Sequence, residues 1–187
     1  MNPILLDFPH EFETERLLIR MPKPGDGRVV HKAICESIDE LRPWLPFAQK
    51  DQTEEDVEVN IRNAHINFLK REGLRLLVFE KESGQLVCSS GLNRIDWDVP
   101  KFEIGYWAVT RHCGKGYATE AVEGITAFAF RELGANRVEI RCDRKNVRSR
   151  AIPERLGYEL EATLKNDDLS VDGNELRDTC IYAKIRD

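Results

Sequence analysis

The sequence has no apolar run approaching the roughly 18 residues that a membrane-spanning helix needs, so none is expected. It has no basic excess either. Its 28 lysines and arginines face 33 aspartates and glutamates, and a net charge of −5 argues against a nucleic-acid or membrane binder. The five cysteines lack a C-x-x-C spacing and the four histidines lack a metal-ligand spacing. We therefore expect no metal, and reduced thiols in a cytoplasmic protein.

The bulk composition fits one domain spanning 1–187. With 41% hydrophobic and 33% charged residues, the chain of 187 residues can bury a core and remain soluble. Residues 1–15 hold little positive charge and soon become acidic, so we do not expect them to be a signal peptide. No internal repeat, low-complexity tract or linker interrupts the sequence.

Hydrophobic periodicity predicts a mixed α/β (α+β) domain with about four helices. The first helix is expected to begin after a cap at Asp26, and the second to run from a near-capping box at Thr53 to about Lys70 and end at Gly73. Two more are expected at 118–133, ended by Gly134, and at 147–156. Strands are expected at 14–20, 74–80, 85–93, 101–109, 136–142, 158–164 and 176–185. A Ser83-Gly84 turn makes the second and third strands antiparallel, and the strand–helix–strand unit 101–142 implies one parallel pair. The sheet should therefore be mostly antiparallel, with about six or seven strands.

The most informative segment is Arg111–Thr119, which joins a predicted strand to the start of a predicted helix. Gly114 and Gly116 allow the backbone to turn tightly and to approach a ligand. The first N–H groups of the helix have no partner within the helix, so they favour an anion such as a pyrophosphate. The segment does not match the residue order of a P-loop, and the sequence after it lacks the further strand–helix units of a dinucleotide-binding fold. The alternative that this is a glycine-rich connection that binds no ligand remains open.

Two motifs resemble those of the GNAT acetyltransferase superfamily. Arg111–Gly116 matches its acyl-CoA motif Q/R-x-x-G-x-G/A, and Asn146-x-x-Ser149 with Arg155–Tyr158 is similar to its second motif. Within the superfamily the chain most resembles the RimJ/RimL group of ribosomal-protein N-terminal acetyltransferases, over about 13–186. That likeness is carried by Thr14–Leu17, Pro43–Leu45, Glu103–Trp107 and Ser149–Arg155.

The resemblance implies a splayed sheet with acetyl-CoA between its fourth and fifth strands, here 101–109 and 136–142. The end of the fourth strand would offer backbone groups to the pantetheine, the amides of the glycine segment would hold the pyrophosphate, and Asn146 would bond the pantetheine from the other side. The expected cofactor-binding residues are Trp107, Ala108, Val109, Arg111, His112, Cys113, Gly114, Lys115, Gly116, Tyr117, Ala118, Thr119, Asn146 and Arg150.

A local basic excess lies in 137–155, with seven basic and three acidic residues, a local charge of +4. Such a patch would attract the phosphates of coenzyme A. A solvated charged face is the plain alternative.

Glu103 is the candidate general base. Strand alternation puts it on the same face as Trp107, and an apolar neighbour would raise the pKa of its carboxyl group. A salt-bridged or solvent-facing role is the alternative. Many superfamily members use a tyrosine to protonate the leaving thiolate, but this chain has Pro153 at that position. Ser149, or a water that it holds, is therefore the candidate proton donor. The alternative is that Ser149 is the N-cap of the helix. Backbone N–H groups near Val109 are expected to hold the carbonyl oxygen.

The resemblance favours a protein N-terminal amine as the acceptor. A small amine (a polyamine, an amino acid or an antibiotic) and a non-catalytic acyl-CoA-binding module stay open. Trp44, Phe47 and the turn at 171–174 are expected to frame the acceptor site, although the two aromatic residues could instead pack in the core. A homodimer is possible, while nucleic-acid and membrane partners are not expected.

Overall fold

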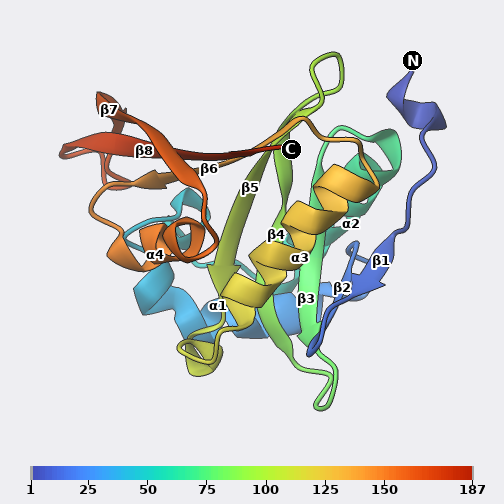
Figure 1. Ribbon diagram of the computed structural model, residues 1–187. Coiled ribbons are helices and arrows are strands. Elements are labelled where there is room, and N and C mark those ends of the chain that lie inside the picture. The colour runs from blue at the N-terminus through green and yellow to red at the C-terminus, as the bar shows by residue number, and fades with distance from the viewer. Residues whose placement is uncertain (1, 187) are drawn as a thin grey trace.

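The computed structural model describes residues 2–186, which form one eight-stranded sheet in the order β1-β2-β3-β4-β5-β6-β8-β7. The strands are β1 (Glu11–Glu13), β2 (Leu17–Arg20), β3 (Leu74–Glu80), β4 (Leu86–Asp96), β5 (Lys101–Ala108), β6 (Arg137–Asp143), β7 (Glu159–Leu169) and β8 (Leu176–Ile185). The helices are α1 (Gly27–Leu41), α2 (Glu54–Lys70), α3 (Tyr117–Arg131) and α4 (Val147–Arg155). In Figure 1, α3 lies in front of the sheet and α1 and α2 lie behind it.

One pair of strands is parallel, and it is short. β5 pairs with β6 only where Lys101–Glu103 face Arg137–Glu139, whereas every other neighbouring pair in the sheet is antiparallel. Beyond Glu103 the two strands part, and Figure 1 shows β6, β8 and β7 turning away from β5. The predicted crossover and the mostly antiparallel sheet are confirmed.

The two faces of the sheet carry separate hydrophobic clusters. Phe102 and Ile104 of β5 belong to the larger cluster, with the buried residues of α3. Val109, which follows β5, belongs to the smaller cluster with residues of α1 and α2, and Trp107 packs against it. Even-numbered residues of β5 therefore face α3, while odd-numbered residues face α1 and α2.

Two strands reach further than expected, and one was missed. β4 runs on to Asp96 through an irregularity in its register, where Arg94 adopts a φ of 45°. β7 runs on to Leu169 through a similar irregularity, although its polar sequence reads as a loop after residue 164. β1 has only three residues, too few for alternation to show.

The predicted cap of α1 is wrong in its chemistry. Asp26 occupies the N-cap position, but its side chain makes no capping hydrogen bond. Its carboxylate instead accepts hydrogen bonds from the guanidinium of Arg20, at 2.7 and 2.8 Å, and from the N–H of Lys23 at 2.7 Å. The guanidinium of Arg20, six residues earlier on β2, outcompetes the helix amides for this carboxylate.

The end of α2 also differs from the prediction. Arg71, with a φ of 65°, takes the left-handed position that Gly73 was expected to supply. The buried Arg71 side chain donates to the carbonyl groups of Phe68 and Leu6 and lies over the ring of Phe8. These tertiary contacts hold the C-terminal end of α2 to the N-terminal segment and offset the strain of the conformation.

The structure confirms the capping box at the start of α2, where Thr53 and Asp56 bond each other's backbone N–H groups. Thr53→Ala removes the bond that satisfies the N–H of Asp56, so we expect the free energy of unfolding to fall by about 1 kcal/mol. Urea denaturation measures the change. Asn63→Ala, at an exposed position of the same helix, should stay within about 0.5 kcal/mol of the wild type. Equal effects of the two substitutions would contradict the assignment.

Candidate active site

A cleft of about 2510 Å³ opens where β5 and β6 part. It is lined from both faces of the sheet, so we distinguish two sides. The α1–α2 side includes Trp44, Glu103, Trp107, Arg141, Asp143, Asp167, Asp168 and Arg177, and the α3–α4 side includes Tyr106, Cys113, Gly114, Gly116, Thr119, Asn146 and Ser149. Across residues 2–186, neither a metal-binding group of three or more His, Cys, Asp or Glu residues nor a helix suited to cross a membrane is found.

The glycine segment presents a row of free amides to the cleft. Gly114 and Gly116 adopt φ angles of 78° and 82°, in the left-handed region that favours glycine. Within residues 2–186, the N–H groups from Gly114 to Thr119 have no hydrogen-bond acceptor, and the first helical bond of α3 is made by Glu120. No side chain caps the helix. The segment therefore offers six consecutive donors and the positive end of a helix dipole to an anion.

A contact from the N-terminal strands holds the glycine segment in place. The carboxylate of Glu120 accepts hydrogen bonds from Thr14 Oγ1 at 2.6 Å, from the N–H of Arg16 at 2.8 Å and from Arg16 Nε at 2.6 Å. Arg16 also donates to the carbonyl of Lys115 at 3.0 Å and lies over the ring of Tyr117. Burial would raise the pKa of Glu120, but these hydrogen bonds outweigh it and lower the pKa. Sequence reasoning missed this brace because its parts lie far apart in the chain.

The end of β5 turns backbone groups into the cleft near Val109, at Ala108 and not at Val109 itself. Val109 donates its N–H to the carbonyl of Val87 at 3.0 Å, so it cannot hold a carbonyl oxygen in the cleft. In an antiparallel ladder the next residue points the other way. The peptide groups of Ala108 and Tyr106 therefore point away from β4, toward the side where β5 has lost β6.

At the start of α4, Asn146 is the cap and Ser149 is not. Asn146 Oδ1 accepts from the N–H of Ser149 at 3.1 Å, so the alternative N-cap role of Ser149 is wrong. Ser149 Oγ donates to Tyr106 Oη at 3.3 Å, and Tyr106 Oη donates to the carbonyl of Ser149 at 2.7 Å. Burial raises the pKa of Tyr106. The sequence analysis did not identify Tyr106 as a site residue. Its even-numbered position on β5, which places it on the opposite face from Glu103, was the available signal.

Glu103 lies on the opposite side of the cleft from Ser149. Its side chain is 18% exposed, and its Oε2 lies 3.4 Å from Arg94 Nε without accepting a hydrogen bond from residues 2–186. Burial raises the pKa of Glu103, while the nearby charges of Arg94 and Arg141 oppose the rise. The ionised side chain is therefore poorly solvated, as the sequence analysis expected of a general base.

Ion pairs use up most of the charges on the α1–α2 side. Besides the Arg94–Glu103 pair, Arg141 lies 3.2 Å from Asp167, and Arg177 lies 2.6 Å from Asp143. Asp168 forms no ion pair within the described chain. Trp44 lines the cleft next to these residues, as does Val171 from the expected turn, but Phe47 does not.

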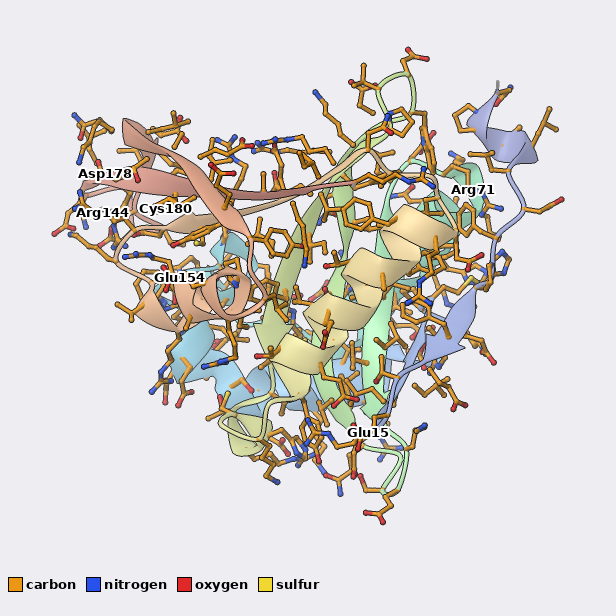
Figure 2. The ribbon with its side chains drawn as sticks, in the orientation of Figure 1. Glu15, Arg71, Arg144, Glu154, Asp178 and Cys180 are labelled. Atoms are coloured by element: carbon orange, nitrogen blue, oxygen red, sulfur yellow. The ribbon has the colours of Figure 1, made fainter. Side chains whose placement is uncertain are left out.

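The predicted basic patch is largely neutralised. Carboxylates of β7, β8 and the turn between them, outside the 137–155 window, pair with its basic residues. The pairs are Arg137–Glu161, Arg141–Asp167, Arg144–Asp178 and Lys145–Glu175. Figure 2 shows Arg144 and Asp178 together in the part of the sheet far from α3. Arg148 and Arg155 line the cleft and have no carboxylate partner among residues 2–186.

Four of the expected site residues do not line the cleft. Arg111 turns away and pairs with Glu36 at 2.9 Å, and Arg150 donates to Tyr182 and Glu154. Lys115 and the buried Val109 are also absent from its walls. The other twelve of the sixteen do line the cleft, namely Glu103, Trp107, Ala108, His112, Cys113, Gly114, Gly116, Tyr117, Ala118, Thr119, Asn146 and Ser149.

Comparisons with known proteins identify the family and the fold. The family described as "Acetyltransferase (GNAT) domain" matches residues 16–159. The chain is 32% identical over 174 residues, 92% of each chain, to YdaF of Bacillus subtilis (strain 168), provisionally named a ribosomal N-acetyltransferase. It is 27% identical to the ribosomal-protein-serine acetyltransferase of Escherichia coli (strain K12), covering 93% of this chain and 95% of the other. The structure of RimL, a ribosomal L7/L12 alpha-N-protein acetyltransferase, in complex with coenzyme A, superimposes with a TM-score of 0.85 at 19% identity, covering 92% of this chain and 95% of that chain.

The brace at Glu120 yields a pH-dependent prediction. Because the pKa of Glu120 is lowered in the folded state, its ionised form stabilises the fold at neutral pH, and this contribution is lost on acidification. Glu120→Gln should therefore lower the free energy of unfolding at neutral pH by about 1–2 kcal/mol. The difference should shrink as the pH falls below the ordinary glutamate pKa of about 4.3.

Urea denaturation at several pH values measures this. Glu123→Gln is the control, because Glu123 is exposed on the same helix and forms no ion pair within residues 2–186. A loss of stability that is the same at all pH values would show that the charge of Glu120 does not act.

Proposed function

The chain belongs to the GNAT family of N-acetyltransferases, and from this premise we propose that it acetylates the N-terminal amine of a protein. Relatives over most of its length are named for ribosomal proteins, which supports an acceptor of that kind. The protein would act through a ternary complex, with the acetyl donor and the acceptor amine meeting in the cleft.

The observation that carries the donor assignment is the row of free amides from Gly114 to Thr119. Six adjacent N–H groups without acceptors, on two left-handed glycines at a helix start, suit a pyrophosphate. Arg148 and Arg155, which have no carboxylate partner in the described chain, suit the phosphate of coenzyme A that lies outside the pyrophosphate. These residues fit acetyl-CoA, which supplies the acetyl group as a thioester.

The parted strands would bring the reacting groups together. The peptide groups of Tyr106 and Ala108 point to the place where a pantetheine would replace β6 as a hydrogen-bonding partner. The N–H of Ala108, rather than that of Val109, would stabilise negative charge on the carbonyl oxygen. Asn146 Nδ2 remains for the pantetheine, since Oδ1 caps α4.

Proton transfer would use both sides of the cleft. Glu103, on the α1–α2 side, would remove the proton from the acceptor ammonium directly or through a water. On the α3–α4 side, Ser149 or a water that it holds would protonate the leaving thiolate, and solvent would return the proton to it. Because the hydroxyl of Ser149 donates to Tyr106 Oη at 3.3 Å, a direct role requires that hydroxyl to rotate toward the thiolate. Because the base and the acid approach from opposite faces of the sheet, the amine would enter from one face and the thiol would leave on the other.

The setting of the reaction is part of the same proposal. All five cysteines are free, as in proteins that work in a reducing compartment, so the cytoplasm is the proposed location. We propose that 1–187 acts as one domain with its core at about 13–186. A homodimer stays a prediction.

The first test concerns the donor site. Gly114→Glu puts a carboxylate and a left-handed strain at the floor of the amide row. We expect the affinity for acetyl-CoA, measured by calorimetry, to fall ~10-fold or more, about 1.4 kcal/mol. Gly134→Glu is the matched control, because Gly134 is also left-handed with open space at its Cβ position but lies away from the cleft. Unchanged affinity in Gly114→Glu would place the donor elsewhere.

The second test concerns the base. The raised pKa of Glu103 means that the rate should increase with pH through a pKa above the ordinary value of about 4.3. Glu103→Gln should lower kcat ~100-fold and abolish this dependence, while the affinity for acetyl-CoA stays unchanged. Asp168→Asn is the comparison, because Asp168 of β7 lines the cleft opposite Arg177 of β8. Loss of its negative charge should weaken binding of the cationic acceptor and raise KM, while the pH dependence stays. If Asp168→Asn abolishes the pH dependence and Glu103→Gln keeps it, Glu103 is not the base.

A further inference from the structure

Arg177 occupies a position on the α1–α2 side of the cleft that the proposed mechanism does not use. It lies on β8 directly opposite Asp168 of β7, so the two side chains share one face of the hairpin. Its side chain is 16% exposed and lines the cleft. An arginine that is largely removed from water normally has most of its five donors satisfied.

The guanidinium is held firmly but only partly bonded. Nη1 donates to Asp143 Oδ2 at 2.6 Å, and the group lies over the ring of Trp44 at 5.5 Å. Nε is buried without a hydrogen-bond partner in residues 2–186, and Nη2 is not buried and makes no hydrogen bond there. Nε also lies 3.8 Å from Glu175 Oε2, so Nη2 is the donor that this fixed, planar group keeps free at the wall of the cleft.

A free donor at this place favours an acceptor that carries an oxygen. A polyamine has no oxygen and would leave this N–H group without a partner, which costs affinity. The N-terminal residue of a polypeptide carries a carbonyl one carbon away from its amine. Asp168, the residue paired with Arg177 across β7 and β8, would attract the positively charged acceptor while Arg177 binds the carbonyl, and Glu103 remains the base that removes the proton.

The surrounding charge argues against a free amino acid. The charged residues that line the α1–α2 side are five carboxylates (Glu40, Glu103, Asp143, Asp167 and Asp168) against three arginines (Arg94, Arg141 and Arg177) and Lys145. Glu175 lies close to both Lys145 and Arg177, at 2.8 and 3.8 Å. Because Arg177 is already neutralised by Asp143, a second carboxylate there would meet a net negative wall. A neutral peptide carbonyl meets no such repulsion.

We propose that Arg177, fixed by Asp143 and Trp44, hydrogen-bonds the first peptide carbonyl of the acceptor, and so restricts the acceptor to polypeptide N-termini. The inference rests on the proposed N-terminal acetylation and names the residue that selects for it. Arg177 is thus a specificity residue, since it contacts the substrate away from the reacting atoms.

The test compares three acceptors that differ only next to the amine: alaninamide, alanine and isopropylamine. The wild type should prefer alaninamide to both others in kcat/KM. Arg177→Gln should lower kcat/KM for alaninamide ~10-fold or more and leave that for isopropylamine within about twofold. Arg144→Gln is the matched control, because Arg144 also pairs with an aspartate in this part of the sheet but does not line the cleft. It should leave all three acceptors unchanged.

The outcomes separate the possible failures. Calorimetry with acetyl-CoA checks that Arg177→Gln is folded. If it is not, Arg177→Lys, which keeps the ion pair with Asp143, replaces it in the comparison. A loss that is equal for alaninamide and isopropylamine would mean a structural role and overturn the inference, as would an unchanged alaninamide rate. A wild type that prefers free alanine or isopropylamine to alaninamide would overturn both the inference and N-terminal acetylation. Acetylation of none of these amines would do the same.

Discussion

The short parallel pairing of β5 with β6 is the constraint on which the site depends. Three residue pairs hold the strands together, from Lys101–Arg137 to Glu103–Glu139, and then the strands part. Because β5 continues to Ala108 bonded only to β4, its outward peptide groups are left without partners. A sheet that stayed closed would satisfy those groups internally and leave no passage between its faces. The cleft, the free backbone edge and access from both faces all follow from this parting.

The alternation of side chains along β5 and β6 then determines which functional groups lie on each face of the sheet. Odd-numbered residues of β5 and β6 face α1 and α2, so Glu103, Arg141 and Asp143 gather with Trp44 in an acidic wall. Even-numbered residues face α3 and α4, where Tyr106 meets Ser149. The donor and the acceptor would thus be bound by different groups: free backbone amides with Arg148 and Arg155 on one side, and carboxylates mostly paired with arginines on the other.

The sequence predicts what local rules govern and misses what distant contacts decide. Periodicity and capping predict all four helices and seven of the eight strands, and the glycine motif predicts the free amides, since each depends on neighbours in the chain. The basic patch fails because its carboxylate partners, such as Glu175 and Asp178, lie on the following hairpin. The expectation of N–H groups near Val109 could not be narrowed to Ala108, because the pairing register, which the sequence does not contain, decides which N–H faces the cleft.

The brace between Arg16 and Glu120 joins positions 104 residues apart in the chain. It ties the floor of the amide row to an edge of the sheet made by the earliest part of the polypeptide. During synthesis those first strands emerge long before α3, so the binding surface can form only after this large loop has closed. Coenzyme affinity is therefore a property of the completed topology, and a fragment bearing the glycine motif with its helix alone would lack the support that shapes it.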